Sequence, residues 1–172
     1  MLFRSVPGVG HLHILRGGEL DLIGPDGLAT RLTEPSLVFF PRAATHRLGA
    51  DEAAGADLIC ASVHFGAEFG NPLVNGLPGC MVVPLAAVPA MQRVLELLFD
   101  EAFHEHCGRT AALDRLSELL LVHLLRHALD AGLLQSGVMA GLADPRLSRA
   151  LQAMHAEDRK STRLNSIHEW IS

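Results

Sequence analysis

The residues best suited to chemistry are three histidines in the first third of the chain. His11 and His13 alternate along an apolar run, so both side chains lie on one face of a strand and could share a metal ion. Zinc and non-haem iron sites need about three protein ligands, so this pair alone is incomplete. His46 follows a turn and can point back toward the space that the strands enclose, which makes it the candidate third ligand.

Two further histidine groups have plainer explanations. His123 and His127 are four residues apart on a helix, as in a zinc protease, but Leu124 stands where the general-base glutamate would be. A structural or interface role fits that pair better. His104 and His106 lie near the end of a helix, where cations interact favourably with the helix dipole. The sequence contains no glycine-rich phosphate loop and no serine framed as a nucleophile elbow.

Composition narrows the class of protein. The 172 residues are 49% hydrophobic and carry a formal net charge of −5, which is typical of a globular chain and gives no basic footprint for nucleic acid. Histidine or arginine interrupts the longest apolar runs, so no membrane span is expected. Three widely spaced cysteines, Cys60, Cys80 and Cys107, form neither a zinc pattern nor a disulfide framework. A reducing cytoplasm is therefore the expected location.

The elements that position the histidines begin with strands. Apolar or alternating runs bounded by glycine and proline predict strands over residues 10–15, 20–23, 28–32, 37–40, 57–65 and 81–83. Gly17 and Gly18 predict a tight hairpin between the first two strands, and residues 24–27 predict the next turn. The run at 37–40 is apolar on both faces, so it belongs in the interior of the β-structure. Residues 49–55 are expected to form a polar surface loop.

Apolar residues recur at helical spacing in the second half of the chain. Two helices are predicted, over residues 88–106 and 111–131, with glycines after them as stop signals. Asp144 and Pro145 predict the cap and first position of a third helix. Strands first and helices last indicate an α+β fold, in which helices pack outside a small barrel or sandwich. The second helix is apolar around most of its circumference, and a dimer contact would explain the excess.

Two stretches have the order of residues found in cupin domains. They are His-Leu-His-Ile-Leu-Arg-Gly-Gly-Glu-Leu at residues 11–20 and Glu-Pro-Ser-Leu-Val-Phe-Phe-Pro-Arg-Ala-Ala-Thr-His at residues 34–46. Residues 113–132 look like the second linker helix of AraC-family transcription regulators, and residues 143–155 look like the opening of that family's DNA-binding half. From Gly10 to Glu157 the sequence therefore resembles an AraC-family regulator with a cupin-type ligand-binding domain.

The resemblance implies a division of the chain and a non-enzymatic role. Residues 6–85 would form a cupin-like β-barrel (a jelly roll), and residues 86–132 a helical hairpin that links and dimerises two copies. Residues 143–157 would be the first helix of a truncated helix-turn-helix domain, and the unusual composition of residues 158–172 predicts a non-native tail. The barrel would sense a small-molecule effector. DNA binding would belong to the full-length family and is not expected for this fragment, which lacks a recognition helix.

Strand placement and the resemblance together give candidate functional residues. The effector pocket is expected to contain His13, Phe39, His46 and His64. The dimer interface is expected along one stripe of the second long helix: Leu113, Leu116, Leu120, Leu124 and His127. No metal or cofactor is expected, because the histidine pair lies closer to the glycine turn than the ligand pair of metal cupins does, and Glu19 falls after that turn. The alternative is a metal-dependent cupin enzyme, such as a dioxygenase or an isomerase.

Overall fold

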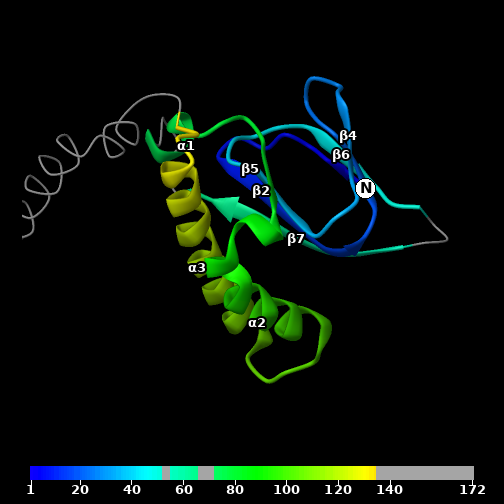
Figure 1. The fold of residues 1–172 in the computed structure, drawn as a ribbon, viewed down its shortest axis with the longest axis vertical. Coiled ribbons are helices and arrows are strands. Elements are labelled where there is room, and N and C mark those ends of the chain that lie inside the picture. The colour runs from blue at the N-terminus through cyan, green and yellow to red at the C-terminus, as the bar shows by residue number, and fades with distance from the viewer. Residues whose placement is uncertain (52–54, 66–71, 135–172) are drawn as a thin grey trace, which may run out of the picture.

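The strands form two antiparallel sheets in the computed structural model, which describes residues 1–51, 55–65 and 72–134. Sheet A has the order β1 (Leu2–Phe3), β6 (His46–Gly49), β3 (Leu20–Ile23), β4 (Ala29–Leu32). Sheet B has the order β7 (Ala56–His64), β2 (Val9–Gly18), β5 (Ser36–Phe40), β8 (Met81–Pro84). Figure 1 shows how these strands are arranged.

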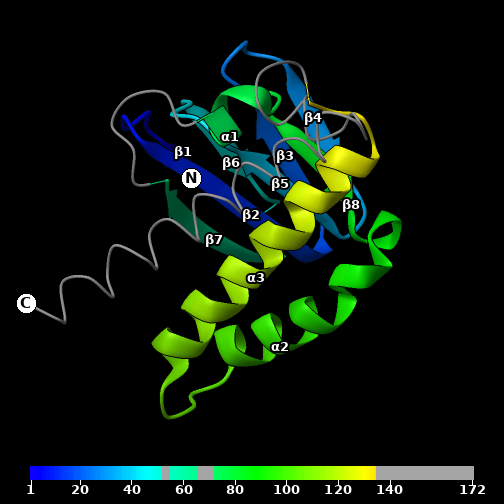
Figure 2. The ribbon, with the colours of Figure 1, turned by 90° about the vertical axis from the view of Figure 1, so that its left-hand side faces the viewer.

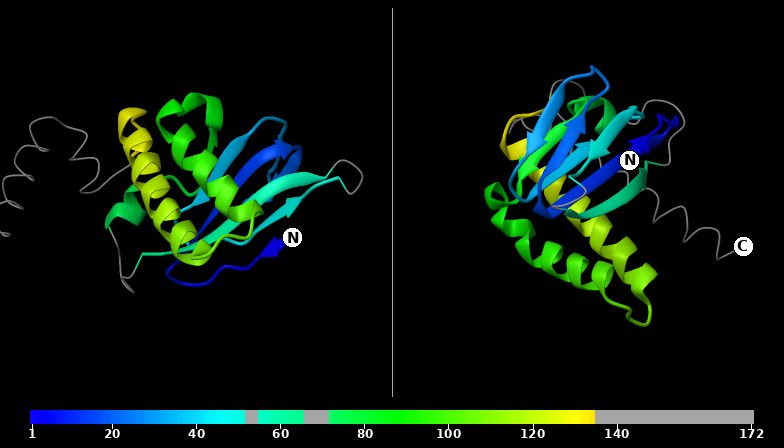
Figure 3. Two further views of the ribbon diagram at one scale, coloured as in Figure 1. Left: turned by 90° about the horizontal axis from the view of Figure 1, so that it is seen from below. Right: turned by 90° about the vertical axis from the view of Figure 1, so that its right-hand side faces the viewer.

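The helices cover the outer face of sheet B. A short helix, α1 (Pro72–Gly76), precedes β8, and two single 3-10 turns, η1 (Leu85–Ala87) and η2 (Pro89–Met91), follow it. The two long helices, α2 (Gln92–Phe103) and α3 (Arg109–Asp130), then pack side by side across the sheet (Figures 2 and 3). The layers therefore run from helices to sheet B to sheet A. No helix within the described ranges is long and apolar enough to cross a membrane.

Strand β5 holds the layers together because both of its faces are buried. Leu37 and Phe39 belong to an apolar cluster with residues of α2 and α3, and both are 0% exposed. Val38 and Phe40 face the other way and belong to a second cluster between the two sheets. This confirms the prediction that the run at 37–40 lies in the interior.

The predicted hairpin at Gly17 and Gly18 is wrong. β2 pairs with β5 and β7, whereas β3 pairs with β4 and β6, so the chain passes here from sheet B to sheet A. Gly18 has a φ of 85°, and a Cβ atom there would lie 2.5 Å from the carbonyl oxygen of Gly55. Glycine is thus required for the crossing, by its backbone conformation and by the close approach of another chain segment.

Other predicted elements agree with the structure in their broad outline. The turn at 24–27 joins β3 to β4 as expected, and the two long helices are present with shorter bounds. Strands β1 and β6 were not predicted; β1 precedes the predicted start of the barrel at residue 6. The fold is mostly antiparallel sheet with a few helices. Its described strands form two sheets and not one closed barrel. The third predicted helix, the helix-turn-helix segment and the tail lie outside the described residues.

Candidate functional site

A cluster of three buried histidines lies between the two sheets. His11 and His13 project from β2 of sheet B, and His46 begins β6 of sheet A. Their exposed fractions are 7%, 0% and 2%. The ring centroids lie 4.9 Å apart for His13 and His46, 5.3 Å for His11 and His46, and 6.1 Å for His11 and His13. The structure therefore brings together the three histidines that the sequence singled out.

A hydrogen bond joins two of these histidines and fixes their tautomers. His46 Nδ1 lies 2.9 Å from the carbonyl oxygen of Ala44, which can only accept, so Nδ1 carries the proton. In the neutral ring His46 Nε2 is then the acceptor, and His13 Nε2, at 2.7 Å, is the donor. His13 Nδ1 is left without a proton. It has no hydrogen-bond partner among the described residues, and neither does His11 Nε2.

Two phenylalanines enclose the His46 ring. Phe3 of β1 stacks on it with centroids 4.9 Å apart and planes 5° from parallel. Phe40 of β5 stacks on it at 4.1 Å and 17°. Phe3 also lies 4.5 Å from the His13 ring. Sequence reasoning missed Phe3, because the strand that carries it is only two residues long and has no periodicity to reveal it.

Burial favours the uncharged form of two histidines in this cluster, His13 and His46. The pKa of His13 is lowered to about 3, chiefly by loss of solvation and to a smaller extent by the neighbouring His46 and His11. Burial also lowers the pKa of His46, with a smaller opposing effect from its bond to Ala44. The hydrogen-bonded pair of His13 and His46 is therefore neutral at pH 7, so it can exchange hydrogen bonds but does not attract anions.

The other two predicted pocket residues lie elsewhere. Phe39 points from the opposite face of β5 into the helix-covered core, with its ring centroid 6.3 Å from that of Phe65. His64 is exposed at the end of β7, where it lines a surface groove together with Asp114 and Glu118 of α3. His13 and His46 are thus the only two of the four predicted pocket residues that meet.

The predicted interface residues of α3 are largely used inside the chain. Leu120 and Leu124 are 0% and 1% exposed in the helix-covered core, and Leu113 and Leu116 pack against the same core. His127 is half-buried. The large apolar side chains that α3 leaves exposed are Leu119, at 44%, and Val122, at 43%, one turn apart. A second copy of the chain could reach these two residues without disturbing the core.

The histidine cluster does not have the arrangement of a metal site. Among residues 1–51, 55–65 and 72–134, no group of three or more His, Cys, Asp or Glu side chains is placed so that it could hold a metal ion. His13 and His46 instead satisfy each other by the hydrogen bond described above.

The family of the protein follows from a comparison that agrees with this double-sheet architecture. Residues 2–130 match the family described as Cupin, so the chain belongs to the cupin family. This confirms the cupin resemblance of the two quoted stretches. The match begins at residue 2 and thus includes the strand β1 that carries Phe3.

Curated relatives narrow the kind of cupin. A putative AraC-like transcription regulator of Streptomyces lividans is 32% identical over 127 residues, covering 72% of this chain and 42% of the relative. Another, of Streptomyces antibioticus, is 32% identical over 60% of this chain and 35% of the relative. An uncharacterized HTH-type transcriptional regulator of Haemophilus influenzae is 28% identical over 56% of this chain and 32% of the relative. The chain thus spans less than half the length of these relatives.

The predicted relationship to AraC-like regulators is confirmed by these relatives, and their names agree with a non-enzymatic role. Among solved structures, apo ToxT of Vibrio cholerae aligns with a TM-score of 0.49 and 9% identity, over 82% of this chain and 57% of that chain. A likeness that low does not bear on function.

Proposed function

We propose that this chain is the effector-sensing and dimerisation part of a cytoplasmic AraC-type transcription regulator. The observation that carries the proposal is the combination of a cupin domain over residues 2–130 with relatives named as AraC-like regulators. A small molecule bound by the cupin domain would favour one placement of α2 and α3 over another. Such a change requires that the molecule bind the two arrangements with different affinity. DNA recognition and the identity of the target genes are proposals about the regulator as a whole.

The packing of the helices supports this proposal. α2 and α3 contribute to the same apolar cluster as the outer face of sheet B. Sheet B and the helices therefore share one core, and a movement of one would be felt by the other. The exposed pair Leu119 and Val122 lies on the far side of α3 from that core. A change inside the domain can therefore alter the surface that a second copy would meet. His13 and His46 would shape the interior of the domain, and their hydrogen bond would help to hold the resulting arrangement in place.

A fusion assay tests both parts of this proposal. The 172-residue chain is joined to a DNA-binding module that represses a reporter gene only as a dimer. We expect repression by the fusion, and we expect some members of a metabolite library to change it. A fusion that never represses, together with a monomeric mass for the purified chain in light scattering, would overturn the proposal.

Elemental analysis of the purified chain distinguishes the regulator proposal from the alternative of a metal-dependent cupin enzyme. A metal-dependent cupin enzyme would carry about one transition metal per chain, whereas the regulator proposal expects none to be needed for repression. Treatment of the fusion with a chelator should accordingly leave repression unchanged.

A further inference from the structure

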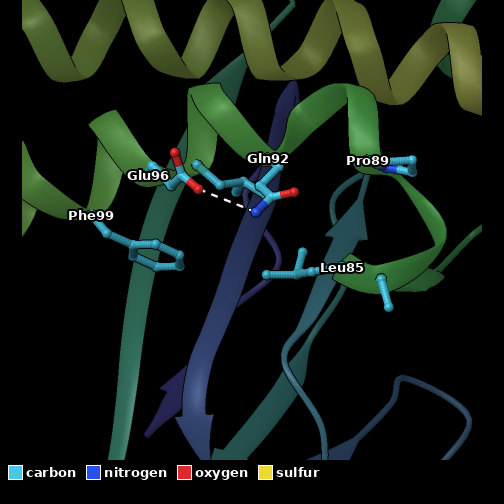
Figure 4. A pocket seen from close by; sticks show the side chains of 7 residues that line it. Leu85, Pro89, Gln92, Glu96 and Phe99 are labelled. Carbon is cyan, nitrogen blue, oxygen red and sulfur yellow. Dashed lines mark hydrogen bonds between the residues drawn. The ribbon is translucent and has the colours of Figure 1, made fainter.

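A surface groove lies between α2 and the segment that leads into it. Its volume is about 350 Å³, which is within the range of small-molecule sites, roughly 300–1,000 Å³. η1 contributes one wall and the first turns of α2 contribute the other, as Figure 4 shows. Most of the lining is apolar, with Leu85, Pro89, Leu95 and Phe99 as its larger side chains. The groove lies outside the two sheets and shares no residue with the histidine cluster.

One ionisable side chain stands among these apolar residues. Glu96 lines the groove, and its Oε1 accepts a hydrogen bond of 3.2 Å from Gln92 Nε2, one helical turn earlier (Figure 4). Within the part of the chain that the structure describes, no cationic side chain forms an ion pair with Glu96. The amide therefore orients a carboxylate that has no ion-pair partner among the described residues.

The arginine beside the groove is already engaged. The Arg16 guanidinium lies 5.7 Å from the ring centroid of Phe99 and 5.1 Å from that of Phe103, where it makes cation–π contacts. Its Nε is also 3.5 Å from Asp57 Oδ2. Arg16 thus already has a carboxylate and two aromatic rings as partners, and the charged side chain that lines the groove itself is Glu96.

We propose that this groove binds a small molecule with an apolar body and one cationic amine group. The apolar body would lie against Leu85, Leu95 and Phe99, and the amine would pair with the carboxylate of Glu96. Apolar surface gives such a ligand most of its affinity, and the single charged contact fixes its orientation.

The groove is also connected, through a shared apolar cluster, to α3, the helix whose exposed face would meet a second copy. Leu95 is 4% exposed and belongs to the same apolar cluster as Leu120 and Leu124 of α3. Phe99 packs against that cluster. A ligand that contacts Leu95 and Phe99 would therefore favour one packing of α2 on α3. The assignment of this groove as the effector site rests on the proposed function, whereas ligand binding itself does not.

Three six-carbon probes test the binding site on the complete chain: n-hexylamine, 1-hexanol and hexanoate. Dissociation constants come from NMR titrations that follow backbone amides of α2. We expect hexylamine to bind about threefold more tightly than hexanol, the size expected of an exposed ion pair, and hexanoate to bind most weakly. Glu96→Gln should abolish the preference for the amine without weakening the binding of hexanol.

Two further variants make the result specific. Glu118→Gln removes an equal charge from α3, where Glu118 pairs with Arg115, and should leave the preference for the amine intact. Ala86→Trp fills the groove from its exposed rim and should weaken all three probes several-fold. The proposal is overturned if the three probes bind alike, or if the preference for the amine persists in Glu96→Gln.

The binding test and the fusion assay test separate claims, so either one can fail while the other succeeds. Amine-selective binding in a chain whose fusion never represses would support the site and reject the regulatory role. Repression that responds to metabolites, in a chain that binds none of the three probes, would support regulation and reject this groove as the ligand site.

Discussion

The hydrogen bond between His13 and His46 joins two side chains that have almost no contact with water. Replacing one partner leaves a buried donor or acceptor unpaired, which typically costs about 1–3 kcal/mol. We therefore expect His46→Leu alone to be strongly destabilising, because the His13 Nε2–H would lose its acceptor. The double variant His13→Leu with His46→Leu should cost about 1–2 kcal/mol less than the sum of the two single variants. Urea unfolding of the four proteins at pH 7 measures this difference.

A surface histidine provides the control for that cycle. His64 is exposed at the end of β7, so His64→Gln should change the free energy of unfolding by no more than about 0.5 kcal/mol. Strictly additive costs for His13 and His46 would show that the two rings do not depend on each other, contrary to the geometry.

The same cluster should make stability depend on pH. In the unfolded chain a histidine takes up a proton below about pH 6.5, whereas burial lowers the pKa of His13 in the folded chain to about 3. The unfolded state therefore binds more protons as pH falls through this window, and stability is lost in the same direction. For His13 alone the loss between pH 7 and pH 5 is about 2 kcal/mol.

Urea midpoints at pH 7 and pH 5 measure that loss. His13→Leu should show a smaller difference between the two midpoints than the unaltered chain, while His64→Gln should show the same difference. Equal pH dependence in the chain with and without His13 would contradict the assignment.

Among the secondary-structure elements, two of the three glycines of β2 have contrasting surroundings. A Cβ atom at Gly10 would lie 2.7 Å from the carbonyl oxygen of Phe40 and 3.1 Å from that of Pro41, so the backbones would have to move apart. A Cβ at Gly17 would meet nothing within 4 Å. We expect Gly10→Ala to destabilise the protein by about 1–3 kcal/mol and Gly17→Ala to be nearly neutral. Thermal unfolding of both variants tests this contrast, and equal melting temperatures would refute it.

The elements that sequence reasoning predicted well are those whose own residues determine their environment. The run at 37–40 is apolar on both faces, so burial on both sides follows directly, and the structure buries both. The amphipathic spacing of α2 and α3 likewise gave their positions to within a few residues. These features need no knowledge of distant partners.

The elements that sequence reasoning missed depend on distant partners. The glycines at 17 and 18 have the composition of a hairpin turn, but the choice between a turn and a crossing depends on which strands pair far away in the sequence. β1 and β6 are too short to show alternation. They are stabilised by pairing with each other, and β6 also pairs with β3. The histidine cluster was predicted only in part for the same reason, since Phe3 and His46 meet through that pairing.

At the scale of the whole molecule, we propose that two copies meet on the outer face of α3. Leu119 and Val122 are exposed, and their replacement by lysine places two like charges on that face of each copy. We expect the purified chain to be a dimer in light scattering and the Leu119→Lys, Val122→Lys variant to be a monomer with unchanged urea unfolding. Leu28→Lys, at a 69% exposed position between β3 and β4, is the control and should remain a dimer. A variant that keeps the dimeric mass would place the interface elsewhere.

The position of His46 between two phenylalanine rings has a spectroscopic consequence. Ring currents from Phe3 and Phe40 add above and below the imidazole, so its carbon-bound protons should resonate well upfield of those of an exposed histidine. Phe3 is held in place by a two-residue strand, with Met1 and Leu48 exchanging backbone hydrogen bonds beside it. Detachment of that strand removes one of the two shielding rings and leaves the other. A single proton resonance of this unlabelled side chain therefore reports whether the first strand is docked on the sandwich.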